Sequence, residues 1–232
     1  MCGQACVFYG AADFSRDTDV ALPASPENVE RLAKTMQALH AEVIEVPPLH
    51  VEYLRKGHVV HFRCRHPEAN GMRLDVMSVM RGLSDFSTLR ERRSSVRIYD
   101  IDVDLMALPD LIAGKKTQRD MDWPMIRRLV EAHYVQFSAE PNAERIGFSL
   151  TELRTPVLLG DMSFRFPDAV EIASGKRLFL KVLSDLKEEE IEKAFLEEEI
   201  REREADRAYW KPLRKELEQM RHALMYGFTN RK

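Results

Sequence analysis

Three aspartates stand at positions where their carboxylates could share a divalent cation. Asp17 and Asp19 are two residues apart, so in an extended strand both side chains would point to the same side of the chain. Asp75 lies between Leu74 and Val76, an apolar setting in which an isolated carboxylate is costly unless it has a partner. Packed carboxylates repel one another unless a cation neutralises them, and Mg²⁺ prefers oxygen ligands. The three acids therefore suggest a metal site that aligns a triphosphate and stabilises a leaving pyrophosphate.

The order of these acids resembles the nucleotidyltransferase superfamily with the DNA polymerase β-like fold. Its pattern is a glycine turn, a spacer, a strand with two alternate aspartates, and one aspartate on a later strand. The residues that match this pattern are, in order, Gly3, Asp17, Asp19 and Asp75. The closer similarity is to bacterial minimal nucleotidyltransferases and the abortive-infection toxin branch, which carry GGxA, a further glycine and Arg-x-Thr before the acids. The residues at those positions are Gly3, Ala5, Gly10, Arg16 and Thr18.

This resemblance covers roughly residues 1 to 135 and implies an activity. A nucleoside monophosphate would move from an NTP to an RNA or protein acceptor. Asp17, Asp19 and Asp75 would bind Mg²⁺ or Mn²⁺, and Asp75 would help to activate the acceptor hydroxyl. The family also has a helix bearing Lys and Arg, followed by Asp, which residues 111–122 resemble. The residues implied to contact the nucleotide are Gly3, Ser15, Arg16, Lys115 and Arg119. The toxin similarity further implies a toxin–antitoxin context, with a tRNA acceptor and an antitoxin protein as partners.

Other interpretations of the same residues stay open. If Asp19 is the first acid of the pair, the second position falls on Ala21 and one metal ligand is lost. The apolar strand that precedes the glycine in the family has no counterpart ahead of the first glycine here. Both features are compatible with a noncatalytic nucleotide-binding or regulatory module on a degenerate nucleotidyltransferase scaffold. Asp75 could also be a strand acid that pairs with Arg63 or Arg73.

Helical and strand patterns alternate in the part of the chain that must position these residues. The expected strands are 20–22, 58–65 and 72–77, with a further pair within 96–108. Ser25 and Pro26 favour a helix start, because serine caps free N–H groups and proline needs no donor at the first helical position. The other expected helices are 4–9, 108–118 and 123–137. This pattern predicts an α+β fold: a nucleotidyltransferase-like mixed sheet flanked by helices.

Composition divides the chain into three parts. Residues 1–137 form the expected nucleotidyltransferase-like domain, and residues 138–184, which contain prolines and glycines, are expected to be a loop-rich connector. Residues 185–232 alternate in charge around a few apolar positions, which is typical of one or two long exposed helices. Pro212 is expected to interrupt them. The apolar seam of this region could pack on the catalytic domain, on a second copy in a homo-oligomer, or on an antitoxin.

The overall composition excludes several classes of protein. With 232 residues, 44% of them hydrophobic, the chain can bury a core without disulfides. No run approaches the roughly 18 consecutive apolar residues that a membrane span needs. A net charge of -3 argues against a protein that coats nucleic acid nonspecifically. The three cysteines form no closely spaced metal pair, and the N-terminus has no signal-peptide pattern, so a cytoplasmic location is expected.

Overall fold

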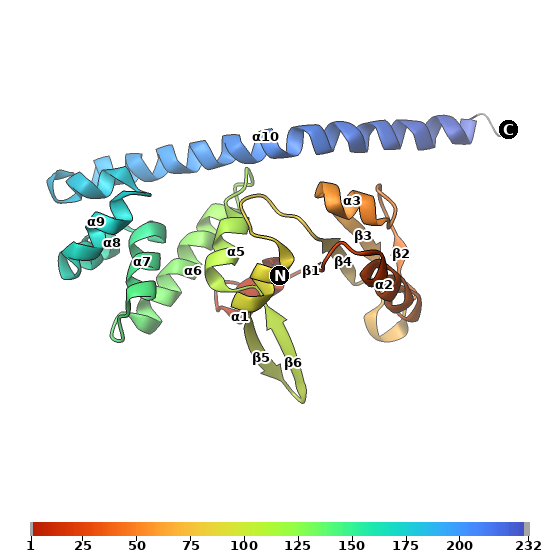
Figure 1. Cartoon of the computed structure of the whole chain (residues 1–232), viewed down its shortest axis with the longest axis horizontal. Helices are drawn as coiled ribbons and strands as arrows, with labels where there is room; N and C mark the ends of the chain where they lie inside the picture. The colour runs from red at the N-terminus through yellow and green to blue at the C-terminus, as the bar shows by residue number, and fades with distance from the viewer. Residues whose placement is uncertain (1, 230–232) are drawn as a thin grey trace. The chain divides into compact units, whose positions relative to one another are not determined.

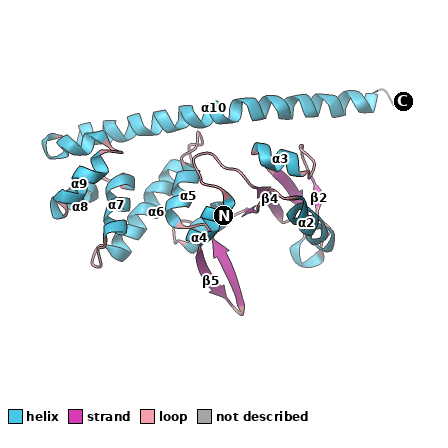
Figure 2. Ribbon diagram, in the orientation of Figure 1, coloured by secondary structure: helices cyan, strands magenta, loops and turns pink. Residues whose placement is uncertain are grey.

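The computed structural model describes residues 2–229, which divide into two compact units (Figure 1). Unit 1 contains the described residues up to Phe8, residues 12–114, and those from Asp206 onward. Unit 2 contains residues 9–11 and 115–205. The expected boundary after residue 137 therefore does not coincide with the division, which falls after Gly114. The class is α+β, with every strand in unit 1 (Figure 2).

A four-stranded mixed sheet forms the centre of unit 1. Its strands are β1 (Asp17–Ala21), β2 (Glu42–Val43), β3 (Val60–Arg63) and β4 (Arg73–Met77). The strand order is β1-β4-β3-β2, in which β1 and β4 are parallel and the other neighbours are antiparallel. The predicted hairpin is confirmed as β3 and β4, joined through the short 3₁₀ helix η1 (Pro67–Ala69).

One face of this sheet carries the core of unit 1. Helices α2 (Pro26–Ala38) and α3 (Val51–Lys56) supply its other apolar residues. Ser25 caps α2, as predicted, because its hydroxyl accepts a hydrogen bond from the Asn28 amide. The buried members of this core are Met36, Leu54, Val60, Phe62, Leu74 and Val76. Since side chains alternate along a strand, the residues between these strand positions point to the opposite face.

The remaining elements of unit 1 follow the sheet in sequence, apart from α1 (Cys2–Phe8), which precedes it. They are α4 (Phe86–Arg92), β5 (Ser94–Ile98), β6 (Ile101–Leu105), α5 (Leu108–Lys115), whose last residue begins unit 2, and the part of the C-terminal helix from Asp206 onward. Strands β5 and β6 pair antiparallel in a separate two-stranded sheet, which confirms the strand pair expected in this region.

Unit 2 is helical, and the expectation of a loop-rich connector at 138–184 was wrong. After α6 (Asp122–Phe137), the chain forms α7 (Ala143–Glu152), α8 (Pro156–Arg165), α9 (Pro167–Ser174) and the 3₁₀ helix η2 (Leu178–Asp185). The prolines begin α8 and α9 instead of breaking a helix, because the first helical residue needs no N–H donor. These helices are short, so each contains too few turns to show a clear apolar period.

Helix α10 (Glu188–Thr229) is a single helix, so the interruption expected at Pro212 was also wrong. A proline removes one backbone hydrogen bond, and the rest of a long helix can hold its path. Tertiary packing supports it here: Leu213, next to the proline, is buried, and the Tyr209 and Leu213 side chains lie against Gly57 of unit 1. Within residues 2–229, no helix combines the length and apolar character needed to cross a membrane.

Candidate functional site: a carboxylate row on the sheet

Strand register places Asp19, Asp75 and His61 in one row across three adjacent strands. Asp19 of β1 pairs with Asp75 of β4, and Asp75 pairs with His61 of β3. Residues that pair directly in a sheet project from the same face, so the three side chains are neighbours. Their positions alternate with the apolar core positions of the same strands, and the row therefore lies on the face opposite the core. The predicted acids Asp19 and Asp75 are thus brought together although 56 positions separate them.

The next row on this face is also charged. Asp17 pairs with Arg73, and Arg73 pairs with Arg63. Asp17 and Asp19 both lie in β1, which begins three residues before the strand expected at 20–22, so their carboxylates point to one side of the chain. The two rows together place carboxylates on β1 beside arginine and histidine side chains on β3 and β4.

Asp75 is buried but not isolated. Its carboxylate lies 2.8 Å from His61 Nδ1 and accepts a hydrogen bond from Arg73 Nε at 3.0 Å. Burial raises the pKa of Asp75, but the hydrogen bonds from His61 and Arg73 outweigh it and leave this pKa below its usual value. Part of the charge expected to need a metal is therefore balanced by the chain itself, and Arg73 is the partner that the simpler interpretation named.

Asp19 has the opposite electrostatics. Burial raises the pKa of Asp19, and the neighbouring carboxylates of Asp75 and Asp17 raise it further. The hydrogen bond from the Gly3 amide lowers this pKa, but the net shift is upward. That amide donates to Asp19 Oδ2 at 3.4 Å. A carboxylate held where its own charge is disfavoured is characteristic of functional sites.

Gly3 and Ser15 hold helix α1 beside the row. The Ser15 hydroxyl donates to the Asp17 carbonyl at 2.8 Å, and a Cβ added at Gly3 would overlap this hydroxyl. Only glycine therefore allows the start of α1 to approach the loop before β1 this closely. The first turn of α1 and the start of β1 form one local structure around Asp19.

Substituting Gly3 with alanine is expected to destabilise unit 1 by about 1–3 kcal/mol, because the new methyl group overlaps Ser15. Urea unfolding of the single variant and of the double variant Gly3→Ala/Ser15→Gly measures the effect. The double variant should recover more than half of the loss, since it removes the group that is overlapped. Equal losses in both variants would show that the contact with Ser15 is not the cause.

The other residues predicted to contact phosphates have different surroundings. Lys115 Nζ pairs with Asp122 Oδ1 at 2.8 Å, and the Thr117 hydroxyl donates to Asp122 Oδ2 at 2.6 Å. These three residues tie the turn between α5 and α6, and Asp122 does so from within the first turn of α6. Arg119 and Arg16 are exposed. Lys115 and Arg119 belong to unit 2, whereas Gly3, Ser15 and Arg16 belong to unit 1 with the acids.

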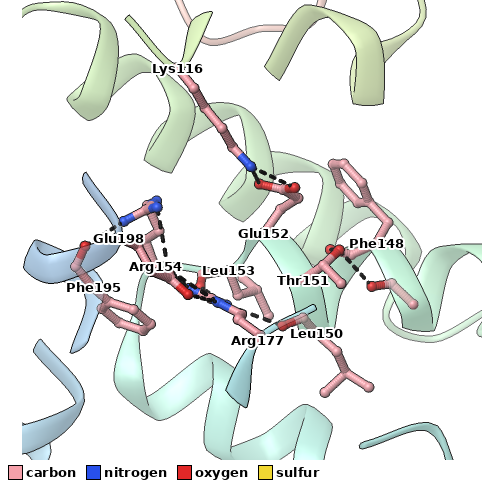
Figure 3. Close-up of polar contacts among 11 residues, drawn as sticks. Lys116, Phe148, Leu150, Thr151, Glu152, Leu153, Arg154, Arg177, Phe195 and Glu198 are labelled. Carbon is pink, nitrogen blue, oxygen red and sulfur yellow. Dashed lines mark hydrogen bonds and ion pairs between the residues drawn. The ribbon is translucent and has the colours of Figure 1, made fainter. Parts of the chain in front are cut away.

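The charged network at the centre of unit 2 was not predicted (Figure 3). Arg177 is only 4% exposed; it donates to the carbonyls of Leu150 and Leu153 at 3.1 and 2.8 Å and pairs with Glu198 at 2.9 Å. Arg154 also pairs with Glu198, at 3.4 Å. The two carbonyls lie at the end of α7, where a helix has no acceptor partners of its own. No local sequence signal marks this network, because its members are 21 to 44 positions apart.

Comparisons of the chain with protein-family models, with curated proteins and with solved structures find no match. Within residues 2–229, no group of three or more His, Cys, Asp or Glu side chains is arranged to enclose a metal ion. Asp19 and Asp75 nevertheless offer oxygen donors from facing positions of two strands. This donor type suits Mg²⁺, which is commonly held by one or two carboxylates together with the phosphates of the substrate.

Proposed function

We propose that the chain is a metal-dependent nucleotidyltransferase of the cytoplasm, with a nucleotidyltransferase-like sheet. It moves a nucleoside monophosphate from an NTP to an RNA or protein acceptor. The single observation that carries this proposal is the pairing of Asp19 with Asp75 on adjacent parallel strands, on the sheet face that the core does not use.

The residues of the row take distinct roles in this proposal. Asp19 and Asp75 hold the Mg²⁺ or Mn²⁺ ion, with Asp17 beside them, and Asp75 also helps to activate the acceptor hydroxyl. The ion, when bound, stabilises the charge that develops on the triphosphate and the leaving pyrophosphate. Arg73, whose Nη2 lies 3.4 Å from Asp75 Oδ2, keeps that carboxylate ionised and positioned.

The phosphate contacts complete the proposal. Gly3, Ser15 and Arg16, which belong to unit 1 with the acids, are the proposed phosphate contacts. We further propose that the chain acts as the toxin of a toxin–antitoxin pair, with tRNA as the acceptor and a protein antitoxin as the partner. We also propose that copies of the chain associate with one another through α10.

A labelling assay tests the proposed transfer. Each α-labelled NTP is incubated with Mg²⁺ or Mn²⁺, total bacterial RNA and protein, and the full chain. Wild type is expected to label one acceptor class, whereas Asp19→Asn and Asp75→Asn lose at least about 10²-fold in rate, the range typical of removing one group that stabilises transition-state charge. Asp13→Asn is the matched control, because this exposed aspartate precedes β1 and should leave the rate unchanged.

The same assay decides which acids form the pair. If Asp17 and Asp19 are the D-x-D residues, Asp17→Asn also loses activity and Ala21→Asp gains none. If Asp17→Asn transfers label at the wild-type rate and Ala21→Asp transfers it faster than wild type, the pair instead consists of positions 19 and 21.

A noncatalytic nucleotide-binding module is the second candidate. The ion pair between Arg73 and Asp75 favours it, because Arg73 already balances the carboxylate charge that a bound metal ion would otherwise balance. This candidate predicts that nucleotide binds but that no NTP labels any acceptor with either metal.

A further inference from the structure

A cleft of about 740 Å³ lies in unit 1 where the parallel strands β1 and β4 end. Pro23 and Ala24, just after β1, and Ser78 and Val79, just after β4, all line it. Ligands of sheets with parallel strands bind outside the carboxyl ends of those strands. The volume falls within the range of small-molecule sites, about 300–1,000 Å³. By contrast, a cavity beside His133 in unit 2 is about 10 Å³ and has room for roughly one water molecule.

Ser78 contributes to this cleft a hydroxyl group that has no hydrogen-bond partner among the described residues. The residue is only 8% exposed, and this hydroxyl is buried. A buried hydroxyl that forms no hydrogen bond destabilises the fold by about 1–3 kcal/mol. The group therefore costs stability in the free protein, and a ligand in the cleft can satisfy it.

One of the three arginines that line the cleft, Arg90, has no carboxylate partner in the part of the chain that the structure describes. Arg55 pairs with Glu52 at 2.9 Å, and Arg93 pairs with Asp104 at 2.8 Å. The Arg90 guanidinium forms no hydrogen bond or ion pair with the described residues, so it is available to a ligand. Guanidinium groups bind phosphate through paired hydrogen bonds.

Asp85 does not compete with a ligand for Arg90. Its carboxylate accepts hydrogen bonds from the Ser87 and Thr88 amides and caps α4. The hydrogen bond from the Ser87 hydroxyl, with further ones from Thr88, lowers the pKa of Asp85 to about 2. Both of its oxygens are therefore occupied by the helix start.

We propose that this cleft binds a nucleotide, independently of the carboxylate row. The Arg90 guanidinium group pairs with phosphate oxygens, and the Ser78 hydroxyl donates a hydrogen bond to the ligand. Phe86, which is half-buried and lines the cleft, provides an aromatic surface for the base. None of these residues belongs to the row of Asp19, Asp75 and His61.

Calorimetric titration of the full chain with AMP and ATP in the presence of EDTA tests this site. EDTA removes the divalent metal ion through which the carboxylate row would hold a nucleotide. Wild type should bind, and Arg90→Ala should bind at least about tenfold more weakly, as expected for loss of a charge-assisted hydrogen bond. Arg97→Ala is the control, because this hairpin arginine is 66% exposed, carries the same charge and lies outside the cleft. Its affinity should equal that of wild type.

Ser78→Ala separates binding from folding. It should weaken AMP and ATP binding while its melting temperature stays equal to or above that of wild type, since it removes an unsatisfied buried hydroxyl. Equal affinity of wild type, Arg90→Ala and Ser78→Ala would overturn the proposal, as would no binding of either nucleotide to wild type. Binding of inorganic phosphate alone, or of an oligoribonucleotide but of neither AMP nor ATP, would also overturn it.

The outcome is independent of the transferase proposal. Asp19→Asn should bind ATP in EDTA as wild type does, even though it is expected to lose label transfer. If nucleotide binds in the cleft but no NTP labels an acceptor, only the transferase proposal is overturned. If label is transferred but no nucleotide binds in EDTA, only the proposal of a nucleotide site in the cleft is overturned.

Discussion

Substituting Glu198 with glutamine is expected to destabilise unit 2 by about 3–5 kcal/mol, the loss typical when one partner of a buried ion pair is removed. Arg177 and Arg154 both pair with this carboxylate, and the two arginine side chains are at most 10% exposed. Glutamine cannot balance either charge. Arg177 also holds the carbonyls at the end of α7, so its displacement would free that helix end as well.

Urea unfolding combined with amide hydrogen exchange measures this effect, because exchange reports each unit separately in a chain that need not unfold in one step. Exchange should increase in α7 and in the first turns of α10. Glu197→Gln provides the matched control: it is the adjacent residue on the same helix, it is exposed, and its effect should stay within about 0.5 kcal/mol. A Glu198→Gln variant as stable as this control would show that the network contributes nothing to folding.

The two acids of the carboxylate row are expected to respond oppositely to the same substitution. Asp75→Asn should destabilise unit 1 by about 1–3 kcal/mol, because it leaves His61 and Arg73 without their shared carboxylate. Asp19→Asn should stabilise unit 1 at pH 7, since it removes a half-buried charge that lies beside other carboxylates and keeps an acceptor for the Gly3 amide. Melting temperatures measured in EDTA, with Asp13→Asn as control, compare them.

The pH dependence has a defined sign for each acid. The pKa of Asp19 is raised in the folded state, so its ionisation destabilises the fold as pH rises through and above the unfolded value, near 3.8. The gain from Asp19→Asn should therefore vanish below that pH. The pKa of Asp75 is lowered, so its stabilisation is present above the unfolded value and is lost as pH falls through the folded value. A gain from Asp19→Asn that persists at pH 3 would contradict this account.

Opposite effects on stability and activity at Asp19 would have a clear interpretation. A residue that destabilises the fold but is required for transfer is retained for its chemistry. If Asp19→Asn raised the stability of the fold and left the rate of transfer unchanged, Asp19 would be a destabilising residue without a role in the site.

Local signals in the sequence were sufficient for most elements of unit 1. Ser25 and Pro26 mark the start of α2, and the turn at 67–71 marks the β3–β4 hairpin. These features depend on residues close in sequence, whose capping and turn preferences act without the rest of the fold. The same reasoning failed at Pro156, Pro167 and Pro212, because a proline both begins and breaks helices and its neighbours in space decide which.

The sequence by itself determined the α+β class and named the candidate acids, because strand alternation and residue type are local properties. Tertiary structure alone decided that Asp19 faces Asp75, that His61 lies within hydrogen-bond distance of Asp75, and that Ser78 and Arg90 share a cleft. It likewise decided that Arg177 and Glu198 meet inside unit 2. Strand register and burial bring together side chains that are distant in sequence, and their pKa values and partners follow from that proximity.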